Sequence, residues 1–192
     1  MKRIWIASSN QHKIEEFQEM MPNVEIKSMK DLKEPVEIIE DGKTFEENAM
    51  IKARTLWEVV REPVISDDSG IEVDGMNKMP GVYSARWMGE DTSYDIKNQA
   101  IIDAVKDTVK TARYVCVIAY VDKDGNGYSY RGTIEGEIYP EQLGTNGFGY
   151  DPIFYYPPFQ TTLANVSDEM KNSVSHRGEA LRKFLDDQGA NL

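Results

Sequence analysis

The sequence predicts a protein of the α/β class. Strand-like segments rich in β-branched and aromatic residues, such as 3–8 and 112–121, alternate with segments whose apolar residues recur at helical spacing, such as 44–61. Residues 64–70 also deliver two adjacent carboxylates at the end of a strand-like run, which is how open α/β sheets present a site. At 192 residues the chain is long enough for one domain over residues 1–192, with at most two small lobes.

Composition excludes several classes of protein. The formal net charge of −11 argues against a general nucleic-acid binder, which needs a basic face, so a phosphate-bearing substrate would need local cations. No window approaches the apolar length of a membrane span, and the start of the chain lacks a cleavage-site pattern. Cys116 lies in an apolar run and is expected to be a buried, inert thiol. We therefore expect a cytoplasmic protein without membrane contact.

The acid pair Asp67 and Asp68 allows two interpretations. Neighbouring carboxylates repel each other, so a fold keeps them together with a cation, a shared proton or capping hydrogen bonds. The functional interpretation is a catalytic or metal-binding pair. The structural one is a turn in which Asp68 or Ser69 accepts backbone N–H bonds.

The first helix is predicted directly after the strand at residues 3–8. Residues 8–10 are good N-cap types, and Ile14, Phe17 and Met21 then share one helical face. Lys13 falls in the first turn, where the helix dipole disfavours a cation. Either an anion such as phosphate completes this site, or Lys13 is a solvated surface residue.

A second strand is predicted at residues 24–28, followed by an irregular acidic connection over 31–41 and a helix over 44–61. Thr44 and Glu47 have the spacing of a capping box, in which Glu47 would reach back to the Thr44 N–H. The alternative is that Glu47 is a metal ligand near Asp67 and Asp68.

The middle of the chain combines one helix with a long hairpin. After the strand at 64–67 we expect residues 71–74 to turn back as its neighbour, and 80–87 to form a loop. A helix is predicted over 93–109, and its candidate buried residues are Tyr94, Ile96, Ile101, Ile102 and Val105. Strands are predicted at 112–121 and 128–139, joined by a turn at 122–127, with a soft lobe boundary near Arg113.

The last third carries a glycine-rich loop and a second group of cations. Three glycines in residues 144–149 free the backbone for tight turns, with Phe148 among them as either a base-stacking platform or a core plug. Ser175 is a natural N-cap for a final helix to about Asp187, so His176 and Arg177 lie in its first turn. Lys171 lies just upstream.

Taken together, six motifs resemble one family over nearly the whole chain. They are residues 8–10 with Lys13, then 44–49, 67–70, 80–86, 147–152 and 175–178. In this order they resemble the inosine/xanthosine triphosphate pyrophosphatases, which clear non-canonical purine nucleotides. The resemblance implies an elongated, two-lobed α/β fold with a long mixed, twisted sheet flanked by helices, a central substrate cleft and a homodimer. It also implies Mg²⁺-dependent hydrolysis of ITP, dITP and XTP to the monophosphate and pyrophosphate.

The resemblance also implies a role for each site residue. Asp68 would activate the attacking water and, with Glu47, bind Mg²⁺, while Ser69 contacts substrate and Asp67 is a second ligand or a structural partner. The residues expected to bind the triphosphate are Ser8, Ser9, Asn10, Gln11, His12, Lys13 and Lys171. Those expected to line the base are Phe148, Gly149, Tyr150 and Asp151, with His176 and Arg177 reading its 6-oxo edge.

Three positions depart from the family's pattern, and two rival functions stay open. Ser9 and Asn146 stand where glycine is common, and His12 stands where a small residue is frequent.

One rival is a related pyrophosphatase acting on pyrimidine or modified nucleotides. The other is an inactive nucleotide sensor. That interpretation predicts the loss of at least one metal-binding or phosphate-binding residue, whereas this chain retains these residues.

Overall fold

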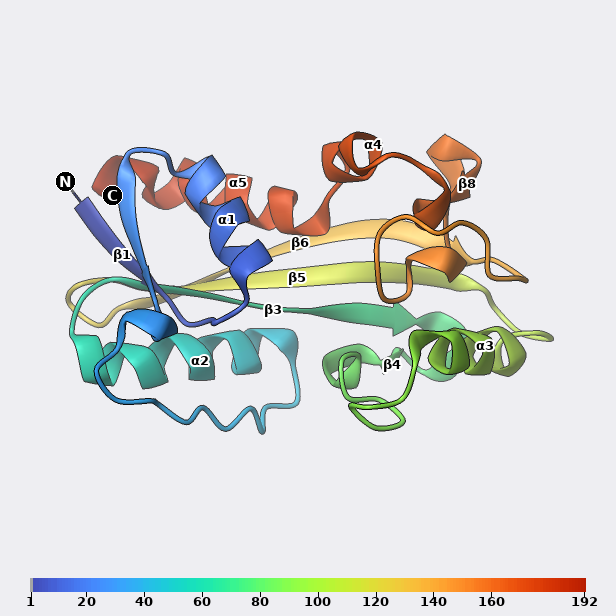
Figure 1. Cartoon of the computed structure of the whole chain (residues 1–192), viewed down its shortest axis with the longest axis horizontal. Coiled ribbons are helices and arrows are strands. Elements are labelled where there is room, and N and C mark those ends of the chain that lie inside the picture. The colour runs from blue at the N-terminus through green and yellow to red at the C-terminus, as the bar shows by residue number, and fades with distance from the viewer. Residues whose placement is uncertain (1) are drawn as a thin grey trace. The chain divides into compact units, whose positions relative to one another are not determined.

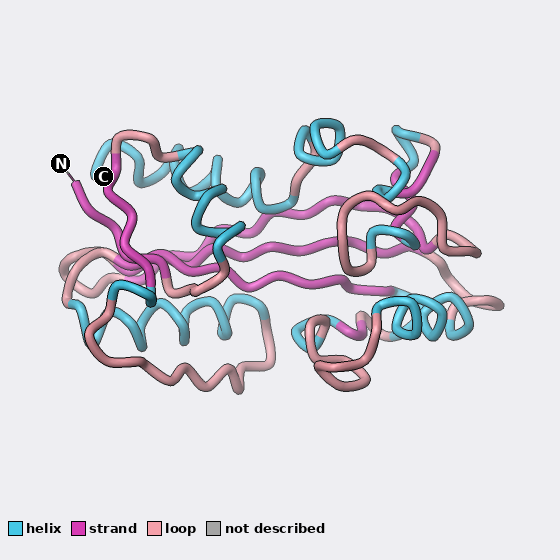
Figure 2. The backbone as a smooth tube through the Cα atoms, viewed as in Figure 1, coloured by secondary structure: helices cyan, strands magenta, loops and turns pink. Residues whose placement is uncertain are grey.

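The structure, a computed structural model, describes residues 2–192 (Figures 1 and 2). Its strands are β1 Lys2–Ile6, β2 Val24–Ser28, β3 Val64–Val73, β4 Met79–Pro80, β5 Thr111–Val121, β6 Gly127–Ile138, β7 Phe154–Tyr156 and β8 Thr161–Thr162. Its α-helices are α1 Gln11–Met20, α2 Phe45–Val60, α3 Tyr94–Ala104, α4 Asp168–Ser173 and α5 His176–Gln188. None of the helices in this part of the chain is long and apolar enough to span a bilayer.

The strands form a mixed sheet. They pair in the order β2-β1-β3-β5-β6-β7-β8, and β4 pairs with β3. β1 runs parallel to β2 and β3, whereas β3 with β4, β6 with β7, and β7 with β8 are antiparallel. The predicted mixed α/β architecture is confirmed.

The chain divides into two compact units. The first unit contains the chain as far as Asp68, together with Cys116–Arg131 and Ala180–Leu192, and the second contains Ser69–Val115 and Gly132–Glu179. The expectation of a single domain with a boundary near Arg113 stays a prediction.

The first unit has one apolar cluster on the α1 and α5 side of its strands. Ile4 and Ile6 of β1 and Ile65 of β3 pack with Phe17 of α1 and Phe184 of α5, all fully buried. Burying one such side chain stabilises the fold by about 1.5–3 kcal/mol. Within this unit, α1 and α5 lie on one side of the strands and α2 lies on the other (Figure 1).

Helix α2 follows its predicted limits. Thr44 Oγ1 accepts the Glu47 N–H at 3.0 Å, and the helix ends where Arg61 turns left-handed at φ 54°. The predicted apolar stripe is Phe45, Ala49, Ala53, Leu56 and Val60; the first four are buried and Val60 is half-buried. Helix α2 is therefore fixed at both ends and along its inner face.

The second unit is built around a separate apolar cluster. Ile71 and Val73 of β3 pack with Ile101 and Ile102 of α3 and with Phe154 of β7. The predicted hairpin is confirmed in β5 and β6, which run through both units, and its turn in the first unit is closed by Gly125 N–H donating to Asp122 O at 3.1 Å.

The turn expected at residues 68–70 is wrong, and so is the return strand expected at 71–74. β3 continues from Val64 to Val73 without a break, because β-branched residues flank the acids on both sides. Successive residues of a strand point to opposite faces, so Asp67 and Asp68 separate without a turn. Ile71 N–H donates to Ser84 Oγ at 2.9 Å instead of closing one.

The face predicted for α3 is also partly wrong, and the helix ends earlier than expected. Ile101, Ile102 and Val105 are buried as predicted, but Tyr94 and Ile96 are exposed. The polar residues Lys97 and Asn98 are buried in their place, each 1% exposed. Both donate to backbone carbonyl groups, which offsets the cost of removing them from water.

Candidate active site

The first unit contains a pocket of about 240 Å³ after the carboxyl end of β1 and beside Asp67 in the middle of β3. Side chains from five parts of the unit converge on it: Ser8, Ser9, Lys13, Glu40, Lys52 and Asp67. We use the name pocket cluster for the charged residues Lys13, Glu40, Lys52, Asp67 and the adjacent Asp68. This arrangement concentrates charge of both signs on one concave surface of a strongly acidic chain.

Lys13 reaches from the first turn of α1 to β3. Asn10 caps that helix by accepting the Lys13 N–H at 3.3 Å, and Lys13 Nζ lies 3.1 Å from Asp67 Oδ1. The Asp67 side chain is 1% exposed, and Lys13 is the partner that balances the charge of this buried carboxylate. The ion pair with Asp67 explains why a lysine lies at the N-terminus of α1, and no bound anion is needed to explain it.

Lys52 of α2 holds the other acid. Its Nζ lies 3.4 Å from Asp68 Oδ1 and 3.0 Å from Glu40 Oε1. Burial lowers the pKa of Lys52, but Asp67, Asp68 and Glu40 together raise it above its ordinary value. The ammonium group is therefore charged at neutral pH.

Asp68 is the least satisfied member of the pocket cluster. Its Oδ2 is buried and has no hydrogen-bond partner among residues 2–192. Burial raises the pKa of the Asp68 carboxyl, the charges of Glu40 and Asp67 act in the same direction, and Lys52 opposes them. A carboxylate with a raised pKa and a free lone pair is suited to accepting a proton or binding a cation.

Two carboxylates of the pocket cluster could serve as ligands for a divalent cation. Across the described chain, no three His, Cys, Asp or Glu side chains form a set that could hold a metal. Mg²⁺ in nucleotide enzymes typically takes only one or two carboxylates, with phosphate oxygens and waters completing its shell. The unpartnered Asp68 oxygen and the Glu40 carboxylate, both beside Lys52, meet that requirement.

The second unit contains the other predicted site residues around Asp151. The Asp151 carboxylate accepts from Tyr114 Oη at 2.9 Å, from Lys171 Nζ at 2.5 Å and from the Phe148 N–H at 3.0 Å. We use the name Asp151 cluster for Tyr114, Phe148, Asp151, Lys171 and His176. Asp151 is 2% exposed, and its three donors offset the cost of burying the charge.

The Asp151 cluster shapes the glycine-rich loop. Gly147 has φ +70°, and a Cβ there would lie 2.2 Å from Asp151 Oδ2, so only glycine fits. Phe148 is 78% exposed, which excludes its interpretation as a core plug. Lys171 Nζ lies 4.5 Å from the centroid of its ring.

Further contacts within the second unit involve α3 and the first turn of α5. Asn98 Nδ2 donates to Gly149 O at 3.1 Å, and the buried Tyr150 donates its hydroxyl to Ser84 O at 2.5 Å. At the start of α5 the His176 ring stacks on Tyr114 at 5.2 Å. Ser175 caps α5 as predicted, because Gly178 N–H donates to its Oγ at 3.2 Å.

The predicted site residues therefore fall into two groups, and some lie outside both. Gln11 bonds to Glu15 and Lys30, and His12 is exposed. Ser69 and Arg177 are half-buried. These assignments stay predictions.

Glu47 departs from the predicted capping box. Its carboxylate is exposed and accepts the Lys43 N–H at 2.6 Å, one residue before the Thr44 N–H of a standard capping box. No contact tests its role as a metal ligand, so that role stays a prediction.

Lys52, Glu40 and Tyr114 are the residues that sequence reasoning missed. Lys52 lies three residues after the buried Ala49, at the edge of the apolar face of α2. A lysine in that position is rarely buried without a partner, so the sequence could have indicated it as a candidate site residue. Glu40 lies in an irregular acidic segment with no periodicity. Tyr114 reads as an ordinary strand residue.

Fold and site together define an α/β protein with a mixed sheet, a charged pocket and a separate aromatic and acidic loop. The chain belongs to the Ham1 family, whose model matches residues 4–187. A curated relative from Exiguobacterium sibiricum, called dITP/XTP pyrophosphatase, is 42% identical over 187 residues, covering 95% of this chain and 94% of that protein. A protein of the same name from Staphylococcus aureus strain MW2 is 40% identical over 190 residues, covering 97% of each.

Solved structures agree with this assignment. The Ham1 protein of Staphylococcus aureus superposes with a TM-score of 0.94 at 38% identity, covering all of both chains. A HAM1 protein from Coxiella burnetii gives a TM-score of 0.93 at 36% identity, covering 99% of this chain and all of that one.

Proposed function

We propose that this protein hydrolyses the non-canonical purine nucleotides ITP, dITP and XTP between the α- and β-phosphates. The products are the nucleoside monophosphate and pyrophosphate. Relatives that cover nearly the whole chain are called dITP/XTP pyrophosphatases, which supports this activity.

The Asp68 carboxylate is the observation that carries the proposal. It has a raised pKa, one oxygen beside Lys52 and one buried oxygen without a partner. Asp68 accepts a proton from the attacking water as the bond between the α- and β-phosphates breaks. A general base of this kind contributes about 10²–10⁴-fold to a rate.

Cations of the first unit bind the triphosphate. Lys13 and Lys52 neutralise phosphate charge, and Ser8 and Ser9 line the same pocket. The neighbouring triphosphate contacts come from Asn10, Gln11 and His12, with Ser69 and Lys171 as further substrate contacts.

Mg²⁺ is the proposed cofactor. Asp68, through its unpartnered Oδ2, and the neighbouring Glu40 carboxylate would hold it, while Lys52 between them binds phosphate. When bound, Mg²⁺ would neutralise charge on the phosphate oxygens and so favour departure of pyrophosphate.

The second unit recognises the base. The exposed Phe148 ring offers a stacking surface, on a loop held by Asp151 and continuing through Gly149 and Tyr150. His176 and Arg177 donate to the 6-oxo group. The 6-amino group of ATP would leave these donors unpaired, which disfavours ATP.

The test is pyrophosphate release from ITP, XTP, ATP, GTP and dTTP, with Mg²⁺ and then with chelator, in the parent and Asp68→Asn. We expect metal-dependent release confined to ITP and XTP and lost in the variant. Equal turnover of all five would keep the hydrolysis and overturn base recognition by His176 and Arg177. Release confined to dTTP would favour a pyrimidine pyrophosphatase, and no release from any substrate would favour a nucleotide sensor.

We also propose that the protein is a homodimer in the cytoplasm, both supported by the resemblance in its motifs. Light scattering coupled to size exclusion should give about twice the chain mass of 21.9 kDa. A mass near that of one chain would contradict the dimer.

A further inference from the structure

The segment that carries Glu40 has no regular structure of its own. Residues 32–43 form neither helix nor strand, yet Ile38 and Glu40 within it line the pocket of the first unit. Glu40 must stay near Lys52, 3.0 Å away, for the pocket cluster to keep its charge arrangement. An irregular segment needs side-chain partners for its backbone groups if it is to hold one conformation.

Two side chains from the first turn of α2 supply those partners. Glu47 Oε2 accepts the Lys43 N–H at 2.6 Å, and Asn48 Oδ1 accepts the Gly42 N–H at 2.8 Å. Asn48 is 1% exposed, so its bond is shielded from water. Consecutive amides at the end of the segment are therefore bound by consecutive residues of one helix.

Gly42 provides independent evidence that this contact is close. A Cβ at this position would lie 2.6 Å from Asn48 Oδ1 and 2.8 Å from Glu47 Cβ. Real Cβ atoms do not approach other atoms so closely, so the backbone packs directly on the helix only because residue 42 is glycine.

The two glutamates consequently differ in what they contact. Glu40 pairs with Lys52, which also pairs with Asp68. The Glu47 carboxylate is exposed and already occupied by the Lys43 amide. Only Asp41 separates Glu40 from Gly42, so fixing residues 42 and 43 restricts where the Glu40 carboxylate can lie.

We propose that Glu47 and Asn48 are positioning residues that anchor the 42–43 backbone and thereby hold Glu40 beside Lys52 and Asp68. Glu47 then acts on the cofactor through Glu40 and is not itself a ligand. The inference rests on the proposed function for the role of Glu40 toward Mg²⁺. The anchoring itself rests only on contacts within the first unit.

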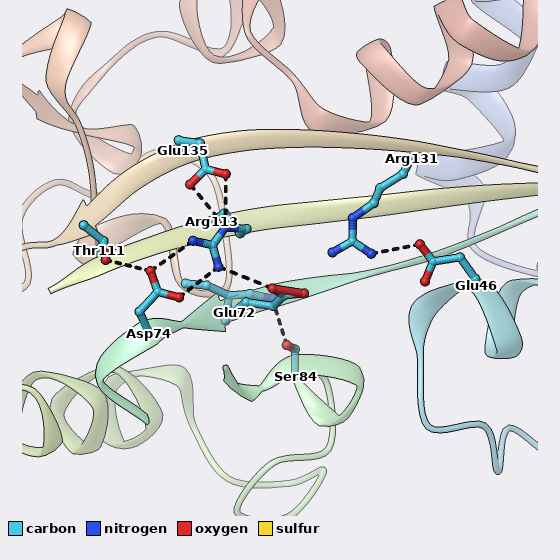
Figure 3. A network of polar contacts seen from close by, with 9 residues as sticks. Glu46, Glu72, Asp74, Ser84, Thr111, Arg113, Arg131 and Glu135 are labelled. Carbon is cyan, nitrogen blue, oxygen red and sulfur yellow. Dashed lines mark hydrogen bonds and ion pairs between the residues drawn. The ribbon is translucent and has the colours of Figure 1, made fainter. Parts of the chain in front are cut away.

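The test compares Glu47→Gln, Glu47→Ala and Glu40→Gln in the nucleotide-free full chain. Mn²⁺ binding by calorimetry reports the cofactor site, and hydrogen exchange reports the Gly42 and Lys43 amides. Glu46→Ala is the matched control, because Glu46 is in the same helical turn but pairs with Arg131 at 2.9 Å (Figure 3).

Glu47→Gln keeps an oxygen that can accept the Lys43 N–H, so it should retain both Mn²⁺ affinity and slow exchange, as should the control. Glu47→Ala should speed exchange at Lys43 by about 10-fold, the effect of losing one hydrogen bond. It should also weaken Mn²⁺ binding about 10-fold, as loss of an outer-shell partner does. Glu40→Gln should weaken Mn²⁺ binding at least as much, with exchange at Lys43 unchanged.

Two results would overturn the inference. If Glu47→Gln weakened Mn²⁺ binding as strongly as Glu40→Gln, Glu47 would be a ligand. If Glu47→Ala left exchange at Lys43 and Gly42 at the parental rate, the anchoring would be absent. Neither measurement uses a nucleotide, so failure of the proposed hydrolysis would be recognised separately.

Discussion

Each unit of the molecule places an aspartate beside a lysine, but the two aspartates are satisfied differently. Asp151 in the second unit accepts from Lys171, Tyr114 and the Phe148 backbone. Asp68 in the first unit contacts Lys52 at 3.4 Å and leaves its buried Oδ2 without a partner within residues 2–192. One carboxylate is saturated with donors and the other is not.

This difference indicates a structural role for Asp151 and a reactive role for Asp68. A buried carboxylate with all its partners fixes the residues that donate to it, which here include the backbone of the Phe148 loop. A buried carboxylate short of partners costs folding free energy, and a fold retains it where a ligand or a proton completes it. The same residue type is thus expected to give opposite results on substitution in the two units.

The largest expected effect is on activity in Asp68→Asn. Pyrophosphate release should fall about 10³-fold, because the proton acceptor is lost. Stability in chelator should rise, because the fold raises the Asp68 pKa and so disfavours the charged form that exists at neutral pH. Thermal melting should show an increase of roughly 2–4 °C, which corresponds to about 1 kcal/mol in a chain of this size.

The matched control is Asp67→Asn, which removes the neighbouring carboxylate from its ion pair with Lys13. This variant should melt at a lower temperature than the parent. If Asp68→Asn also melted lower, the contrast between an unsatisfied and a satisfied carboxylate would be wrong.

The next largest effect is on the stability of Asp151→Asn. The new amide NH2 can replace the oxygen that faces Tyr114 Oη, which is able to accept, but the substitution leaves the Lys171 cation without its buried counter-charge. We expect a loss of about 3 kcal/mol in urea unfolding, typical of a broken buried ion pair. Asp107→Asn, at an exposed carboxylate of the same unit, should change stability by less than about 0.5 kcal/mol.

A smaller effect is expected from Asn98→Leu, which leaves the Asp151 cluster intact but removes the donor to Gly149 O. The KM for ITP should rise about fivefold with kcat little changed, because about 1 kcal/mol of loop positioning is lost. Gln99→Ala, at the next and exposed residue of α3, should leave KM unchanged. An unchanged KM in Asn98→Leu would mean that the bond from Asn98 does not position the loop.

The smallest effect is expected on the stability of a variant at Asp74, a carboxylate near the surface of the second unit whose two oxygens both accept hydrogen bonds. Arg113 donates to both oxygens of Asp74 at 3.0 Å, and also bonds to Glu72 and Glu135 (Figure 3). The Arg113 bonds, with one from Thr111, hold the pKa of Asp74 below its ordinary value of 3.8.

The resulting stabilisation is complete above pH 3.8 and is lost as the pH falls through the lower pKa of the folded state. Asp74→Asn should therefore lose about 0.5 kcal/mol at pH 7, the scale of a solvent-screened pair. Its deficit relative to the parent should shrink at pH 3 in urea titrations. A deficit that stayed constant with pH would contradict the charge-based origin.

Local signals predicted much of the fold. The Thr44 and Asn10 caps, the apolar stripe of α2 and the turn after Asp122 each act within a few residues, and each was confirmed. The run through Asp68, Ser69 and Gly70 was misread because turn-forming residues can also lie within a strand when neighbouring strands pair with it. Tertiary pairing outweighed local propensity there.

The site was less predictable than the fold. Motif order led to Lys13 and Asp68, but Glu40 and Lys52 meet Asp68 only through the folding of an irregular segment and a helix face. The burial of Lys97 and Asn98 likewise depends on carbonyl acceptors at Ala85 and Gly149, which are distant in sequence. Contacts of this kind are set by tertiary structure, and a single sequence carries no period or spacing that reports them.

The division of the chain into interleaved units limits how the molecule can be taken apart. The first unit draws Ile4 from β1, Tyr120 from β5 and Phe184 from α5 into one core, with the second unit's segments inserted between them in sequence. No continuous fragment encodes either unit, so a clone ending at Asp68 would lack half of the core that supports its own pocket. Every residue that lines the pocket of the first unit has been translated once synthesis reaches Asp67. The pocket can nevertheless form only after α5 has been synthesised, because α5 completes the core that supports it.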